Sequence, residues 1–136
     1  MADGFPSPFT EESGRQFLER ASAQPLRMFA ITVDDAVVGS IGIFPETDIH
    51  RKNAAIAYWL AEPFWGKGIT TKAISQIVEY GFSNFDITRI YAKPYGSNRG
   101  SRRALEKSGF ELEATIKNGV FKNGQYLDEL IYSLRR

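Results

Sequence analysis

The stretch FWGKGITTKA, residues 64–73, places two glycines directly before a segment with helical periodicity. Gly66 and Gly68 can adopt backbone conformations that other residues disfavour, at a cost in chain entropy. From Ile69 onward the apolar residues recur at helical spacing, which predicts a helix that runs to about Ser83. Because a helix N-terminus presents unpaired N–H groups and the positive end of the helix dipole, this turn is a candidate phosphate-binding site.

The motif is not one of the two best-known phosphate loops. Its spacing differs from that of a P-loop, and no third glycine follows to complete a dinucleotide fingerprint. A Gly-x-Gly pair before a helix can also do no more than turn the chain. On this stretch alone, both interpretations stay open.

Three strands are predicted before the glycine turn. The apolar, β-branched runs 26–33 and 36–44 are joined by Asp34-Asp35, a polar turn of hairpin type, so they should pair antiparallel. Residues 45–51 form a polar loop, and the alternating stretch 53–61 is the third strand.

Two further helices are predicted from capping signals. One is capped by Thr10 and ends near Ala23. The other lies in NRGSRRALEKSGF, begins at Asn98 or Ser101 and runs to Lys107.

The rest of the sequence is predicted to form strands. A short one covers 87–94, and residues 110–134 hold two long strands with Asn118-Gly119 as a candidate bulge and Asn123-Gly124 as the hairpin turn. The order of elements predicts one α/β domain over 1–136, with a mostly antiparallel sheet flanked by helices.

Composition narrows the classes of partner. The chain has 136 residues, and its 17 basic and 16 acidic residues nearly cancel to a net charge of +1, so we expect no nucleic-acid partner. It contains no cysteine and no long apolar segment, from which we expect no thiolate chemistry, no membrane partner and a cytoplasmic location.

Three motifs together resemble one protein family. They are YWLAEPFWGKGI at 58–69, NRGSRRALEKSGF at 98–110 and GQYLDELIYSL at 124–134. In this order they are similar to the GNAT superfamily of acetyl-CoA-dependent N-acetyltransferases, in particular to the RimJ/RimL branch that acetylates ribosomal-protein N-termini. The resemblance implies a sheet splayed at a bulged central strand, acetyl-CoA as cosubstrate and a primary amine as acceptor.

The resemblance also assigns the cosubstrate contacts. The strand 57–61 would splay from its neighbour, with the backbone of Tyr58, Trp59 and Leu60 bonding the pantetheine arm and the Leu60 N–H polarising the acetyl carbonyl. The pyrophosphate would face the backbone N–H groups of the glycine turn, which comprises Trp65, Gly66, Lys67, Gly68, Ile69 and Thr70.

The second motif would supply the proton chemistry. By resemblance, Asn98 lines the pantetheine channel, and Ser101 lies near the thioester sulfur as a candidate general acid. Tyr95 is a second candidate for that role. Asn98 and Ser101 could instead be helix-capping residues. The mechanism needs no metal.

Some positions depart from the family pattern. Pro63 stands where the family usually has Gln or Arg, and Ala55 stands where the family strand often has Glu, so a carboxylate that could relay the amine proton is missing. No base is identified. Titratable groups near the expected acceptor mouth are Glu46, Asp48, His50 and Glu62, and water is an alternative.

The resemblance leaves three functions open. Family members normally begin with a further strand and helix that this sequence lacks, so we expect an N-terminally short domain with an exposed sheet edge that favours a homodimer. The acceptor could be a peptide or protein N-terminus, or a small amine, which a strongly acidic groove would favour. A non-catalytic acyl-CoA-binding module is the third alternative.

Overall fold

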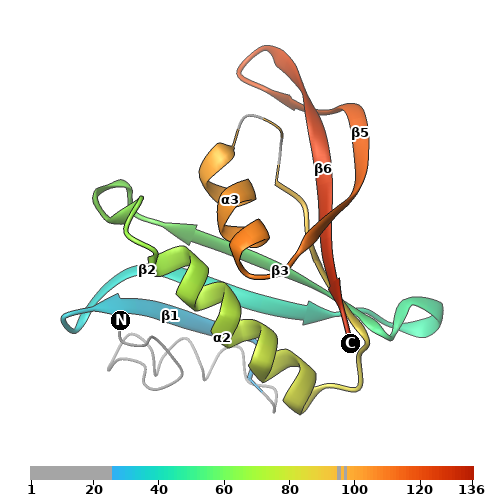
Figure 1. The fold of residues 1–136 in the computed structure, drawn as a ribbon, viewed down its shortest axis with the longest axis horizontal. Helices are drawn as coiled ribbons and strands as arrows, with labels where there is room; N and C mark the ends of the chain where they lie inside the picture. The colour runs from blue at the N-terminus through green and yellow to red at the C-terminus, as the bar shows by residue number, and fades with distance from the viewer. Residues whose placement is uncertain (1–25, 95, 97) are drawn as a thin grey trace.

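The computed structural model describes residues 26–94, 96 and 98–136, and Figure 1 shows their arrangement. The helix predicted between Thr10 and Ala23 lies outside the described residues, as does Tyr95. The strands are β1 Met28–Val33, β2 Ala36–Pro45, β3 Asn53–Leu60, β4 Arg89–Ala92, β5 Glu111–Lys122 and β6 Gln125–Arg135. The helices are α2 Ile69–Asn84 and α3 Arg99–Lys107, with short 3-10 turns η1 Asp48–His50 and η2 Glu62–Phe64.

The strands form one six-stranded sheet in the order β1-β2-β3-β4-β6-β5. Only β3 and β4 pair in parallel, because the chain crosses between them through α2. The two predicted hairpin turns are confirmed. Asp34 and Asp35 both have positive φ, as do Asn123 and Gly124, which matches the turn type that suits the twist of paired strands.

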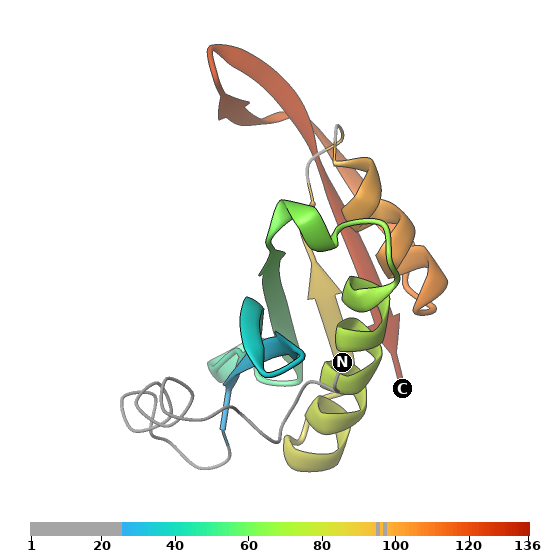
Figure 2. The same cartoon turned by 90° about the vertical axis from the view of Figure 1, so that its left-hand side faces the viewer.

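Both described helices pack on the same face of the sheet, as Figures 1 and 2 show together. The helix α2 buries one stripe of small and branched side chains, Ala73, Ile74, Ile77, Val78 and Gly81, as its helical spacing predicts. Among residues 26–94, 96 and 98–136, no helix is long and apolar enough to span a bilayer.

The sheet opens between β3 and β4. The parallel register stops at the pair Ala55–Tyr91, whereas β3 stays paired with β2 as far as Leu60. Beyond β4 the chain follows β6, since the carbonyl of Pro94 accepts from the Leu130 amide at 2.9 Å. In Figure 1, β1–β3 fan to the left while β5 and β6 rise to the top.

The splay is therefore present, but the predicted bulge in the central strand is wrong. The β2–β3 register is continuous from Gly39–Leu60 to Pro45–Ala54. The gap arises because β4 is short and the following Pro94, which has no N–H, directs its carbonyl to β6. A bulge does occur between Ile116 and Val120 of β5, around Asn118 with φ of 56°, where Asn118-Gly119 predicted one.

Gly39 lets β2 approach the open strand closely. A Cβ at this position would lie 2.3 Å from the Trp59 carbonyl oxygen. We expect Gly39→Ala to lower the free energy of unfolding by about 1–3 kcal/mol, because a backbone atom cannot move away as a side chain can. Urea denaturation measures this loss. The matched control is Gly100→Ala, where an added Cβ meets no atom within 4 Å; equal stability of the two variants would contradict the prediction.

Candidate functional site

Backbone groups of β3 face the gap without a neighbouring strand. The Ala61 amide donates to the Val38 carbonyl on β2 at 2.8 Å. Because hydrogen-bonding direction alternates along a strand, Tyr58 and Leu60 turn their N–H groups away from β2. Beyond Ala55 no strand pairs with β3 on that side among the described residues. The strand thus offers free backbone groups to which an extended ligand can hydrogen-bond as a neighbouring strand would.

Two tryptophans border this strand. The Trp65 indole Nε1 donates to the Leu60 carbonyl oxygen at 2.6 Å, which ties the glycine turn to the end of β3. Trp59 and Trp65 are 57% and 61% exposed, so they are rim residues and not core residues. With the Leu60 carbonyl taken, its N–H is the group left for a ligand.

The glycine turn leaves an open cradle at the start of α2. Gly66 and Gly68 have φ of 76° and 79°, and a Cβ on either would meet no atom within 4 Å. Gly68 is the N-cap and supplies no side-chain oxygen to the first turn. The first helical bond is from the Lys72 amide to Gly68. The N–H groups of residues 69–71 therefore point out of the helix end, where an anion is stabilised.

A hydroxyl pair joins β3 to α3. The Tyr58 hydroxyl and the Ser101 Oγ lie 2.6 Å apart in a partly buried position. Burial raises the pKa of the Tyr58 phenol, an effect that the hydrogen bond to Ser101 partly opposes. The phenol therefore keeps its proton at neutral pH.

Asn98 caps helix α3, which is one of the two roles that the sequence left open for it. Its Oδ1 accepts the Ser101 backbone N–H at 3.1 Å, so the helix begins after Asn98 and not after Ser101. Capping places Ser101 in the first turn, with its hydroxyl directed to Tyr58 and not to the backbone. The two residues act together, since the cap of one orients the other.

The structure brings together most of the predicted site residues. Tyr58 contacts Ser101 through their hydroxyls, and Trp65 of the glycine turn bonds the Leu60 carbonyl at the end of β3. Sequence reasoning assigned only the backbone of Tyr58 and missed its hydroxyl. Its alternation with buried Ile56 and Leu60, which puts its side chain on the helix-covered face, was the available signal.

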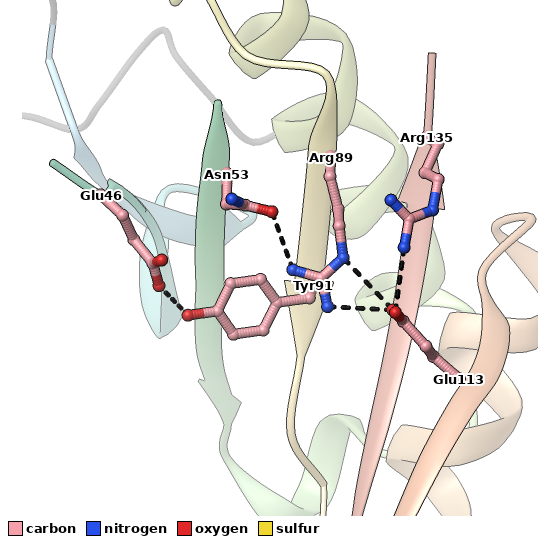
Figure 3. A network of polar contacts seen from close by, with 6 residues as sticks. All are labelled: Glu46, Asn53, Arg89, Tyr91, Glu113 and Arg135. Carbon is pink, nitrogen blue, oxygen red and sulfur yellow. Dashed lines mark hydrogen bonds and ion pairs between the residues drawn. The ribbon is translucent and has the colours of Figure 1, made fainter. Parts of the chain in front are cut away.

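The other face of the sheet carries a polar network (Figure 3). The Arg89 guanidinium bonds Glu113 at 2.9 and 3.2 Å and the Asn53 amide oxygen at 2.9 Å, and Arg135 shares Glu113 at 2.9 Å. The Tyr91 hydroxyl donates to Glu46. In the part of the chain that the structure describes, no cluster of His, Cys, Asp or Glu could hold a metal ion.

A strand that is open on one side, next to a glycine-bordered helix N-terminus, can bind an extended ligand that carries phosphates. Proteins with this arrangement form the class to which the chain is compared. The model of the family described as an acetyltransferase (GNAT) domain matches residues 1–111. The chain belongs to this GNAT family, as the sequence motifs predicted. It spans 55% of the length of the first curated relatives that it matches.

Three relatives illustrate the range of the family. The ribosomal-protein-serine acetyltransferase of Escherichia coli is 30% identical over 107 residues, which cover 79% of this chain and 59% of that protein. The E. coli spermidine N(1)-acetyltransferase is 26% identical over 103 residues, 76% and 55% of the two chains. The structure of Mycobacterium smegmatis RimJ in complex with CoA-disulfide is 30% identical with a TM-score of 0.73, covering 90% of this chain and 58% of that one.

Proposed function

We propose that this chain binds acetyl-CoA in the gap between β3 and β4 and transfers the acetyl group to a primary amine. The observation that carries the proposal is the Tyr58–Ser101 hydroxyl pair beside the free N–H groups of β3. Relatives that are acetyltransferases, and a related structure with a bound CoA group, support it. Acyl transfer from a phosphate-bearing thioester requires three groups, and this gap holds all of them. They are free backbone N–H groups along β3, a helix N-terminus that can bind phosphate, and a hydroxyl that can donate a proton.

The residues present fit the cosubstrate. The backbone groups of Tyr58 and Leu60 that face the gap would bond the pantetheine arm as an added strand would. The Trp59 backbone, which was expected to contribute, faces Ser40 of β2 instead. The open space at both glycines would admit phosphates to within reach of the helix N-terminus, because no side chain occupies it. The pyrophosphate contacts would come from Gly66, Lys67, Gly68, Ile69 and Thr70. Trp65 was also expected to contribute, but its backbone N–H donates to the Glu62 carbonyl at 3.0 Å and its indole N–H to Leu60.

The chemistry is direct transfer without a protein nucleophile. The Leu60 N–H stabilises the negative charge that develops on the carbonyl oxygen as the amine attacks. Ser101 protonates the leaving thiolate, and Tyr58 resupplies that proton through their hydrogen bond. Asn98 holds Ser101 in position through its cap.

The acceptor we favour is a peptide or protein N-terminus, which the ribosomal-protein-serine acetyltransferase supports. The spermidine N(1)-acetyltransferase relative supports the alternative, a small amine. A non-catalytic acyl-CoA-binding module is the third candidate. Measured turnover would exclude it. A homodimer and a cytoplasmic location stay predictions; light scattering tests the first.

One paired experiment tests the function. Calorimetry measures acetyl-CoA binding, and thiol release is then followed on the same sample with short peptides and small amines. Binding with turnover supports the proposal, and the most efficient amine identifies the acceptor class. Binding without turnover indicates the binding module. Absence of binding contradicts the phosphate role of the glycine turn.

The raised pKa of Tyr58 gives a pH prediction. The phenol is the proton source for Ser101, and burial raises its pKa above the ordinary value of about 10. With saturating substrates, kcat should therefore not decline on the alkaline side below about pH 10. A pH–rate profile measures this. A descending limb near pH 8 would mean that another, more acidic group donates the proton.

A further inference from the structure

A cleft of about 260 Å³ lies on the face of the sheet opposite α2 and α3. Arg89 and Tyr91 alternate along β4 with buried Ile90 and Ala92, so their side chains point to this opposite face. Figure 3 shows the Tyr91 ring reaching from β4 across β3 to Glu46. The cleft is lined mainly by polar and titratable side chains: Glu46, His50, Asn53, Arg89, Tyr91 and Lys93.

The cleft adjoins the point where the sheet opens. Tyr91 belongs to the last β3–β4 pair, with Ala55. On the cleft side β3 then presents Ala57, a small side chain that leaves the gap accessible. At about 3.3 Å per residue, Tyr58 lies about 10 Å further along the strand than Ala55, and Leu60, whose N–H would face the acetyl carbonyl, lies about 16 Å further. The other face is closed by α3 through the Tyr58–Ser101 contact, so an acceptor can approach the thioester from the cleft.

Glu46 is the available carboxylate in this cleft. Tyr91 donates one hydrogen bond to it, which leaves most of its acceptor sites for a ligand. Burial, together with the Glu46 carboxylate, raises the pKa of Tyr91 to about 12, so the phenol stays a donor at neutral pH. The Arg89 guanidinium bonds Glu113 and Asn53 instead. Among the described residues, none forms an ion pair with Glu46.

The cleft is mixed in charge, which bears on the acceptor. Lys93 is exposed, with its ammonium 5.7 Å from the Tyr91 ring centre, and Arg89 lies 4.7 Å from the same ring. These cations disfavour a ligand with several positive charges next to Glu46. A single amine, as at a peptide N-terminus, fits better than a polyamine.

We propose that this cleft receives the acceptor's primary amine, that Glu46 accepts a proton from its ammonium group through intervening water, and that Tyr91 positions the Glu46 carboxylate. The inference rests on the proposed acetyl transfer. The nitrogen loses two protons as the C–N bond forms and the C–S bond breaks. One passes through Glu46 to solvent. The other is also released to solvent, which returns one proton to the Tyr58–Ser101 pair after Ser101 has protonated the sulfur.

Kinetics of Glu46→Gln test the role of the carboxylate. At pH 7, kcat/KM for an alanyl peptide should fall at least about 10-fold, because the amide cannot take a proton. The loss should shrink above about pH 9, since peptide α-amino groups with a pKa of about 8 are then already neutral. The groups that face Glu46, namely His50, Arg89, Tyr91 and Lys93, are unchanged in this variant.

The control is Glu111→Gln, which removes an exposed carboxylate outside the cleft and should match the wild type. An equal loss in Glu46→Gln at pH 7 and 9.5 would assign Glu46 a structural role and overturn the proposal. Tyr91→Phe should also lower kcat/KM. If Tyr91 acts through Glu46, a variant that carries both Glu46→Gln and Tyr91→Phe should lose no more kcat/KM than Glu46→Gln alone. Additive losses would show that Tyr91 does not act by positioning Glu46.

A binding measurement separates this inference from the function itself. His50 is the single histidine of the chain, so its imidazole NMR signals report on the cleft without assignment ambiguity. Alanyl-alanine amide, added to the protein with CoA, should shift these signals, and its N-acetylated form should bind more weakly. Glu46→Gln should weaken binding of the free amine at least 10-fold, about 1.4 kcal/mol.

Each outcome is decisive. A His50 shift without thiol release from any amine would refute acetyl transfer and retain the amine site. Thiol release with no His50 shift, or with equal rates in Glu46→Gln, would retain acetyl transfer and overturn the cleft assignment. Peptide that neither binds nor reacts overturns both.

Discussion

Ser101→Ala is expected to lower kcat by about 100-fold or more while leaving the dissociation constant of acetyl-CoA within about threefold, because general acid catalysis contributes this much. The variant removes the hydroxyl that lies 2.6 Å from Tyr58, but it retains the Asn98 cap, which uses the Ser101 backbone N–H. Calorimetry gives the affinity, and thiol release gives the rate.

Two controls make the result specific. Ser108→Ala removes a hydroxyl at the other end of α3, where the Oγ bonds the Ala104 carbonyl at 2.9 Å, and should keep the wild-type rate. Tyr58→Phe should give a smaller loss, about 10-fold, because Ser101 then draws its proton from solvent. A larger loss in Tyr58→Phe than in Ser101→Ala would make Tyr58 the acid. An unchanged rate in Ser101→Ala would remove the serine from the mechanism.

Gly68→Asp is expected to separate stability from binding. Asp tolerates positive φ better than most residues, so at the left-handed backbone of Gly68 the variant should lose only about 1–2 kcal/mol of stability. The same carboxylate would stand where the cosubstrate phosphates are expected. Repulsion at about 5 Å in a partly screened site amounts to about 2–3 kcal/mol, so the dissociation constant of acetyl-CoA should rise about 100-fold.

Gly68→Asn is the matched variant, since it has the same shape and also tolerates positive φ, but carries no charge. It should bind acetyl-CoA far better than Gly68→Asp. Calorimetry and thermal unfolding on both variants give the affinities and the stabilities. Equal binding by the two variants would mean that no anion approaches this helix end.

The secondary structure could be read from the sequence because its signals are local. The period of the apolar residues placed α2 and the strands to within about two residues of the observed ends, an error expected at frayed ends. Asp34-Asp35 and Asn123-Gly124 marked hairpin turns through the backbone angles that these residues tolerate. The glycine turn was identified in the same way.

The sheet opening was foreseen only by resemblance, and its cause was misjudged. A bulge is a local feature that residue types can indicate, as Asn118-Gly119 did in β5. The splay instead depends on which neighbour the chain beyond β4 bonds. That is decided by Pro94 and Leu130, which are far apart in sequence.

By itself, the sequence determined the order of the elements, the hairpin turns and the glycine-bordered helix N-terminus, because backbone preference and periodicity act over a few residues. Only the tertiary structure decided that the Tyr58 hydroxyl meets Ser101, 43 residues away, and that Tyr91 meets Glu46 across 45 residues. Such contacts depend on strand register, on the face to which each side chain points and on where two strands part. Those properties arise from packing the whole chain around one core.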